Sequence, residues 1–116
     1  MLELTINGKT YGVKFGIGFL KEINAQKVAE GEEIGFKNAV FNIATDGNPT
    51  YLFDVLNVAN KGQSPRVPVK DLEQYIEEHE DLEGLCNTVL DFLRENSCTR
   101  KLMEAAEEII KKLEEK

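Results

Sequence analysis

The first fifteen residues constrain the fold of this chain more than any other segment. Apolar and polar side chains alternate over residues 2–6 and again over residues 9–15, and Asn7-Gly8 stands between the two runs. Alternation is typical of a strand with one buried face, and Asn-Gly favours a two-residue type I′ turn because both positions need a positive φ. We therefore predict an antiparallel β-hairpin. Its register pairs Ile6 with Lys9, Leu4 with Tyr11 and Leu2 with Val13.

One face of the predicted hairpin is apolar, and the other carries Glu3, Thr5, Thr10, Gly12 and Lys14. A hairpin of two strands is barely stable by itself in water, so helices must cover its apolar face. Both exposed edges would also be open to strand addition from another copy, so self-association through them is possible. The residues of the apolar face are Leu2, Leu4, Ile6, Tyr11, Val13 and Phe15.

Helical spacing of apolar residues replaces the alternation after residue 15. A first helix begins near Gly16, and its pattern fades from Gln26 to a break at residues 31–33. Gly47 ends a second helix as a left-handed cap. The first helix carries a stripe of Ile17, Leu20 and Ile23 beside Phe19, and the second carries Phe36, Ala39, Val40, Ile43 and Ala44.

A third helix is predicted over residues 49–60. Asn48 is a good cap for its free amides, Pro49 suits its first position, and Lys61-Gly62 closes it. An extended connector follows at residues 63–70, because two X-Pro pairs bias the backbone away from helix. The inward residues of the third helix are predicted to be Leu52, Val55, Leu56 and Ala59.

The remainder of the chain is also helical in pattern. Asp71 with Gln74 resembles a capping box for a short helix, and Asp81 is a candidate cap for a longer one, which Asn96-Ser97 ends or bends. A last helix continues to the final residues. The apolar residues of these helices are Leu72, Tyr75 and Ile76, then Leu82, Leu85, Cys86, Val89, Leu90 and Leu93, then Leu102, Ala105, Ala106, Ile109, Ile110 and Leu113.

The predicted fold class is α+β and mostly helical, a two-stranded hairpin packed against five or six helices. A length of 116 residues suits a single domain. A composition of 41% hydrophobic and 30% charged residues excludes wholesale disorder. The predicted parts of the domain 1–116 are the hairpin at 1–15, a helical core at 16–62, the connector at 63–70 and acidic helices at 71–116.

The acidic residues are concentrated in the second half. Residues 1–69 hold 7 basic and 7 acidic side chains, whereas residues 70–116 hold 7 basic and 14 acidic, which gives the whole net charge of −7. This balance disfavours binding to a nucleic-acid backbone. The densest acidic stretch, residues 71–83, is either a solvated helix face or a surface for a basic or amphipathic protein, with Glu77, Glu78 and Glu80 as candidate contacts.

Candidate catalytic and metal-binding residues are few. His79 stands alone among glutamates and has no second histidine at helical spacing, so it is predicted to be a surface residue. Cys86 and Cys98 lack the pattern of an activated nucleophile, and Cys86 is better explained as a small buried residue. Gly16-Ile17-Gly18 lacks the third glycine of a dinucleotide site. We therefore expect no enzyme activity, no cofactor and no metal.

The expected compartment is the cytoplasm. No apolar run approaches the roughly 20 residues of a membrane span, and the first residues do not resemble a secretory signal. Two cysteines do not form a disulfide framework. No membrane association is expected.

The stripe of the last helix has two explanations. It packs either into the core of this domain or into a groove of another protein or a second copy. In the second case Leu102, Ile109, Ile110 and Leu113 are the candidate contacts.

Two segments near the start carry a family likeness, LTINGKTY at residues 4–11 and KFGIGFLKEIN at residues 14–24. Two later segments agree with them, DGNP leading into LFDVLNVA at residues 46–59, and the acidic residues 71–83 followed by residues 85–93. Together they resemble the tail assembly chaperones of siphophages that infect low-GC Gram-positive hosts. The likeness covers the chain from its start to about residue 96.

The resemblance implies a small, non-catalytic α+β protein. Such a protein binds the long helical tail tape measure protein, keeps it soluble and helps to recruit tail tube subunits, often through a longer form made by ribosomal frameshifting. It would act in the host cytoplasm and be absent from the mature virion. The alternative is a small acidic cytoplasmic adaptor or regulatory subunit that binds a single protein partner.

Overall fold

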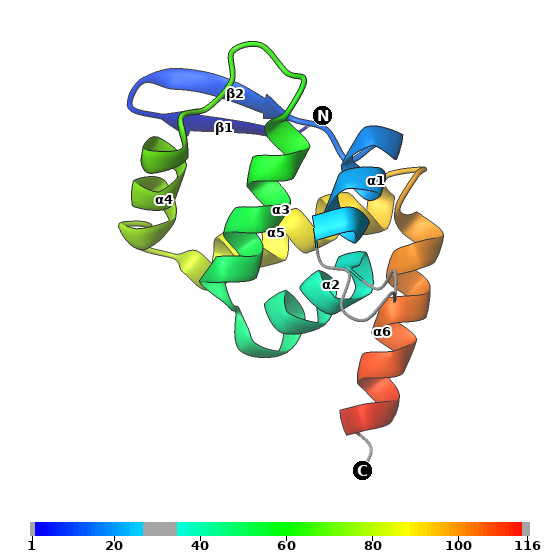
Figure 1. Ribbon diagram of the computed structural model, residues 1–116. Helices are drawn as coiled ribbons and strands as arrows, with labels where there is room; N and C mark the ends of the chain where they lie inside the picture. The colour runs from blue at the N-terminus through cyan, green and yellow to red at the C-terminus, as the bar shows by residue number, and fades with distance from the viewer. Residues whose placement is uncertain (1, 27–34, 115–116) are drawn as a thin grey trace.

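Figure 1 shows the computed structural model of the chain, which describes residues 2–26 and 35–114. The prediction of a mostly helical α+β fold with an N-terminal two-stranded antiparallel hairpin is confirmed, and six helices occur in the described residues. The predicted break at residues 31–33 lies outside them. The elements are β1 (Leu2–Ile6), β2 (Lys9–Val13), α1 (Ile17–Gln26), α2 (Gly35–Asp46), α3 (Pro49–Asn60), α4 (Val69–Glu77), α5 (Leu82–Glu95) and α6 (Arg100–Glu114).

The hairpin has the predicted register, with Leu2 opposite Val13 and Ile6 opposite Lys9. Asn7 and Gly8 have φ values of 52° and 81°, as a type I′ turn requires. The whole predicted apolar face, including Phe15 just beyond β2, is buried. Local sequence therefore specifies the register of this element, because the turn and the alternation specify the same pairing.

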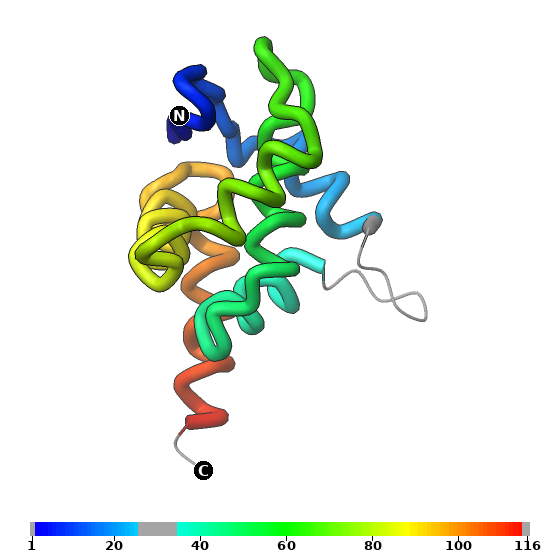
Figure 2. Tube along the Cα trace, turned by 90° about the vertical axis from the view of Figure 1, so that its left-hand side faces the viewer, coloured from blue at the N-terminus to red at the C-terminus, as the bar shows by residue number. Residues whose placement is uncertain are grey.

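The helices are arranged around α2 and α3. Figures 1 and 2 show the hairpin at one end of the molecule, beside the end of α3 and the start of α4, while the last turns of α6 project at the opposite end. α2 packs against α1, α3, α5 and α6, and α3 contacts α1, α4 and β2. The buried side chains of the strands and all six helices join in one hydrophobic cluster. The exposed outer faces of α4 and α6 are therefore held on a rigid interior.

The inward stripe of α1 differs from the prediction. Ile23 is buried as expected and Leu20 is partly buried, but Ile17 is 67% exposed. Phe19 takes the inward position instead, and its ring packs edge-on against Phe15 and Phe36 with centroids 5.2 and 6.2 Å away. Because residues two apart point to opposite sides of a helix, a buried Phe19 turns Ile17 toward solvent.

The ends of α2, α3 and α5 follow the predicted caps. Gly47 has a φ of 60° and donates its N–H to the Ile43 carbonyl at 3.0 Å, although Ala44, predicted to face inward, is exposed. The Asn48 side chain accepts from Thr50 N–H at 3.0 Å at the start of α3. Asp81 accepts from the Gly84 N–H at 3.0 Å at the start of α5. All four predicted inward residues of α3 are buried.

The start of α4 corrects the prediction of a capping box. The helix begins at Val69, Pro68 precedes it in an extended conformation, and no side chain caps it. The Pro68 carbonyl accepts from the Leu72 N–H at 3.1 Å, so the helix starts before Asp71. Asp71 therefore lies in the first turn, where its charge complements the positive end of the helix dipole. The connector ends at Pro68, shorter than the predicted 63–70.

Asn60 joins three parts of the fold. It is 0% exposed, and its amide nitrogen donates to the Gly12 carbonyl of β2 at 2.8 Å. Its side-chain oxygen accepts from the Val67 N–H and from Arg66 Nη1, each at 2.7 Å. Asn60 therefore fastens both the hairpin and the connector to the end of α3.

Candidate functional site

The residues considered for chemistry do not gather into a site. His79 is half-buried at the end of α4, where its Nδ1 accepts from the Asp81 N–H at 3.1 Å and its ring meets Tyr75 edge-on. Burial raises the pKa of Tyr75. Residues 2–26 and 35–114 contain no group of three or more His, Cys, Asp or Glu side chains that could hold a metal ion. The arrangement around His79 is a local helix-end contact.

The two cysteines are far from equivalent. Cys86 is buried in α5, as predicted, and Cys98 is exposed in the turn before α6. Burial, and then the nearby Glu83 carboxylate, raises the pKa of the Cys86 thiol. A thiol held in its protonated form is a poor nucleophile, so Cys86 acts as a packing residue.

The acidic stretch forms an exposed surface over α4, the following turn and the start of α5. Glu77, Glu78 and Glu80, the three acidic residues selected from the sequence, are all exposed. Asp81 in the same stretch caps α5. Carboxylates in this position leave a strongly negative surface, open to a positively charged partner.

The four candidate contacts on α6 separate into two pairs. Ile110 is buried and Leu102 packs against the core, so these two side chains stabilise the fold. Ile109 and Leu113 are 49% and 50% exposed. Met103, whose burial was not predicted, is fully buried on the same helix.

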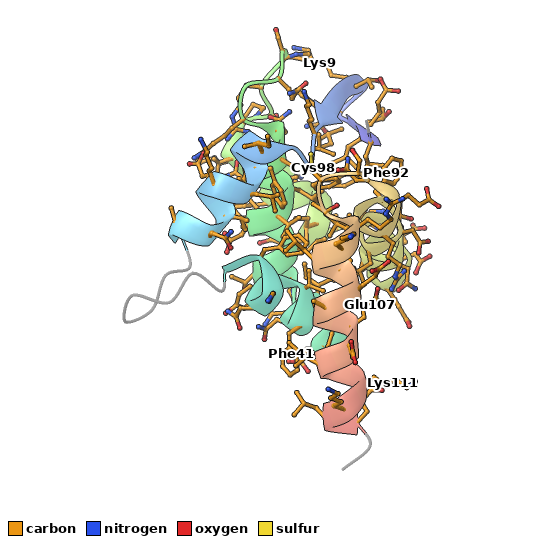
Figure 3. All side chains as sticks on the ribbon, turned by 90° about the vertical axis from the view of Figure 1, so that its right-hand side faces the viewer. Lys9, Phe41, Phe92, Cys98, Glu107 and Lys111 are labelled. Atoms are coloured by element: carbon orange, nitrogen blue, oxygen red, sulfur yellow. The ribbon has the colours of Figure 1, made fainter. Side chains whose placement is uncertain are left out.

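Glu107 identifies the side of α6 that faces α5. Its carboxylate accepts from Arg94 of α5 at 3.0 and 3.1 Å. Steps of about 100° per residue place Ile109 and Leu113 on the opposite flank of the buried face, toward α2. Figure 3 shows Phe41 of α2 beside this lower part of α6, with Glu107 and Lys111 along the helix. Exposed apolar side chains therefore follow the projecting end of α6.

A hollow between α3 and α4 was not predicted. It measures about 240 Å³ and is lined by Pro49, Thr50, Phe53, Glu73, Ile76 and Glu77. The i,i+4 spacing of Glu73 and Glu77 around Ile76 is visible in the sequence. The position of Phe53 against them is not visible, because it depends on how α3 packs beside α4.

A larger groove lies beside α1. It measures about 590 Å³ and includes Gly16, Ile17, Gly18, Lys61 and Cys98 in its lining. Lys61 and Glu22, both on its rim, form an ion pair. The exposed Ile17 is therefore part of a groove and not an isolated surface residue.

The edges of the hairpin are less open than predicted. The Lys14 N–H, just past β2, donates to the Ala59 carbonyl at 2.9 Å, and the Gly12 carbonyl accepts from Asn60. The expectation that both edges offer unpaired backbone groups is therefore wrong for this part of β2. The end of α3 occupies it.

Comparison with known proteins gives one match. The family model described as phage tail assembly chaperone protein, TAC, matches residues 3–108, which run from β1 into α6. No curated protein and no solved structure matches the chain.

No helix in the described part of the chain has the length and apolar character needed to cross a membrane.

Proposed function

The chain belongs to the phage tail assembly chaperone family, and we propose that it binds the tail tape measure protein, keeps it soluble and helps to recruit tail tube subunits around it. The observation that carries this proposal is the family match, which begins at the second residue of β1, includes helices α1 to α5 in full and enters α6. A member of this family is expected to contact tail proteins. The host range, including a Gram-positive host, stays a prediction.

The surface of the molecule supports a binding role without chemistry. A tape measure protein exposes long apolar helix faces until the tube encloses it, and such faces associate with each other unless they are covered. The chaperone offers exposed Ile109 and Leu113 on α6 and the carboxylates of Glu77, Glu78 and Glu80 near the end of α4. The apolar residues would cover partner surface, and the carboxylates would make bound complexes repel one another.

The place of action follows from the same role. Tail assembly precedes release of the phage, so we propose that the chaperone works in the host cytoplasm and is absent from the finished virion. Contact with tail tube subunits is assigned to a longer form made by frameshifting. The short form is then responsible for the tape measure protein, and self-association of chaperone copies along that long partner is compatible with it.

Co-expression tests the proposal. The tape measure protein from the same phage is produced with and without this chain, and its soluble fraction and co-elution in size-exclusion chromatography are measured. We expect soluble, co-eluting tape measure protein only when the chaperone is present. If the tape measure protein stays insoluble with both the short and the longer form, the chaperone role is wrong and the adaptor function takes its place.

A further inference from the structure

The hollow between α3 and α4 has the size of one side chain. Its volume of about 240 Å³ is below the roughly 300–1,000 Å³ typical of small-molecule sites. Its apolar lining is held in place, since Ile76 is buried and Phe53 packs against the core. A preformed apolar hollow on two helices suits an apolar side chain presented by a partner helix.

The rim of this hollow is negative. Glu73 and Glu77 are both exposed and lie one turn apart on α4, where like charges repel. Within the described residues neither carboxylate has an ion-pair partner. The last turn of α4 holds no basic residue to offset the negative end of the helix dipole. A cation placed here would relieve both unfavourable interactions.

We propose that this hollow receives an apolar side chain from an amphipathic helix of the tape measure protein, and that a lysine or arginine of that helix, one turn away, pairs with Glu73 and Glu77. This inference rests on the proposed function and assigns its recognition chemistry. The partner segment is basic and amphipathic, and the binding energy combines apolar burial with charge pairing. Binding is therefore expected to weaken as salt concentration rises.

Charge reversal tests the rim. The variant E73K/E77K is compared with E104K/E108K, which changes the same charge at the same spacing on the side of α6 away from Ile109 and Leu113 and away from the hollow. The probes are the co-expressed tape measure protein and overlapping synthetic peptides of its sequence, measured by co-elution and fluorescence anisotropy. We expect E73K/E77K to raise Kd at least about tenfold for peptides that carry an apolar residue near a lysine or arginine, and E104K/E108K to have little effect.

Filling the hollow with a larger side chain tests whether its apolar lining binds the partner. Thr50 is exposed, and Asn48 holds its backbone N–H, so Thr50→Trp blocks the hollow without removing a core contact. Circular dichroism confirms that each variant is folded. Loss of peptide binding in T50W supports the proposal. Wild-type binding by both T50W and E73K/E77K overturns it, as does an equal loss in E104K/E108K.

A further comparison separates a structural role of the two glutamates from a role in binding. Glu73 and Glu77 lie near the start of α3, whose dipole favours negative charge. If they serve only that helix, E73Q/E77Q lowers the free energy of unfolding and leaves peptide binding intact, which overturns the proposal. If the wild-type chaperone binds no tape measure protein at all, this result contradicts the proposed function rather than the assignment of this hollow.

Discussion

The two halves of the chain use polar side chains differently. In residues 2–68 asparagines bond within the fold over long sequence separations. Asn24 accepts from the Phe36 N–H at 2.9 Å, and Asn38 donates to the Tyr51 hydroxyl at 3.2 Å. In residues 69–114 exposed carboxylates predominate, and a long-range pair there joins Arg94 to Glu107 at the surface.

The contrast follows from the cost of burial. A neutral amide can be buried when its donors and acceptors are satisfied, whereas a carboxylate loses far more hydration. Asparagines can therefore fix the hairpin, the connector and the first three helices against each other. The acids of the second half stay in water, where they remain available to a partner. Substitutions should consequently cost stability in the first half and binding or solubility in the second.

The largest expected effect is that of Asn60→Ala. The change leaves the Gly12 carbonyl and the Val67 N–H without their side-chain partner in a buried position. Each unsatisfied buried group costs about 1–3 kcal/mol, so we expect a loss of about 3 kcal/mol in the free energy of unfolding. Urea denaturation followed by circular dichroism measures it.

Asn57→Ala is the matched control for this prediction. Asn57 lies one turn earlier on α3 and bonds the same Arg66 guanidinium at 2.9 Å, but it is only half-buried. Its loss should cost less than about 1 kcal/mol, because water can replace the bond. Equal losses in the two variants would contradict the role assigned to Asn60.

Most of the fold was predictable because its signals are local. Asn7-Gly8, Asn48 and Asp81 each act on backbone within a few residues, and each has its predicted role. One error is also local, because α4 begins at Val69 and Asp71 therefore forms no capping box. The other errors concern interactions between distant segments. Ile17 faces solvent because Phe19 packs between Phe15 and Phe36, and that packing is a property of the assembled fold.

The candidate site was predictable only in part, for the same reason. The exposure of Glu77 follows from a helix that is apolar on one side, and that of Glu78 and Glu80 from the charged turn after it. The division of the α6 stripe into buried Ile110 and exposed Ile109 depends on where α2 and α5 lie. The hollow under Phe53 requires α3 and α4 side by side, and nothing in either segment alone indicates it.

A smaller effect is expected at Asp81, which tests whether any acid of the second half has a structural role. Asp81→Ala removes the side-chain cap of the Gly84 N–H, and we expect a loss of about 1 kcal/mol in the free energy of unfolding. Asp81→Asn keeps an acceptor at the cap and should stay within a few tenths of a kcal/mol of the wild type. The cap explanation is wrong if the two variants lose stability equally, since charge would then be responsible.

The smallest effect on stability is expected for the triple variant E77Q/E78Q/E80Q. These side chains are exposed and cap no helix, so the free energy of unfolding should change by no more than about 0.5 kcal/mol. The complex with the tape measure protein should nevertheless become less soluble, because Glu78 and Glu80 no longer keep neighbouring complexes apart and Glu77 no longer pairs with a cation of the partner. Turbidity and sedimentation of the co-expressed complex measure this, with E95Q/E104Q/E108Q, three exposed glutamates of α5 and α6, as a control of equal charge. Unchanged solubility in the first variant removes the proposed role of these glutamates. An equal loss of solubility in both variants would show that only the total charge matters. The acidic surface at the end of α4 would then have no special role, and the functional difference between the two halves of the chain would be wrong.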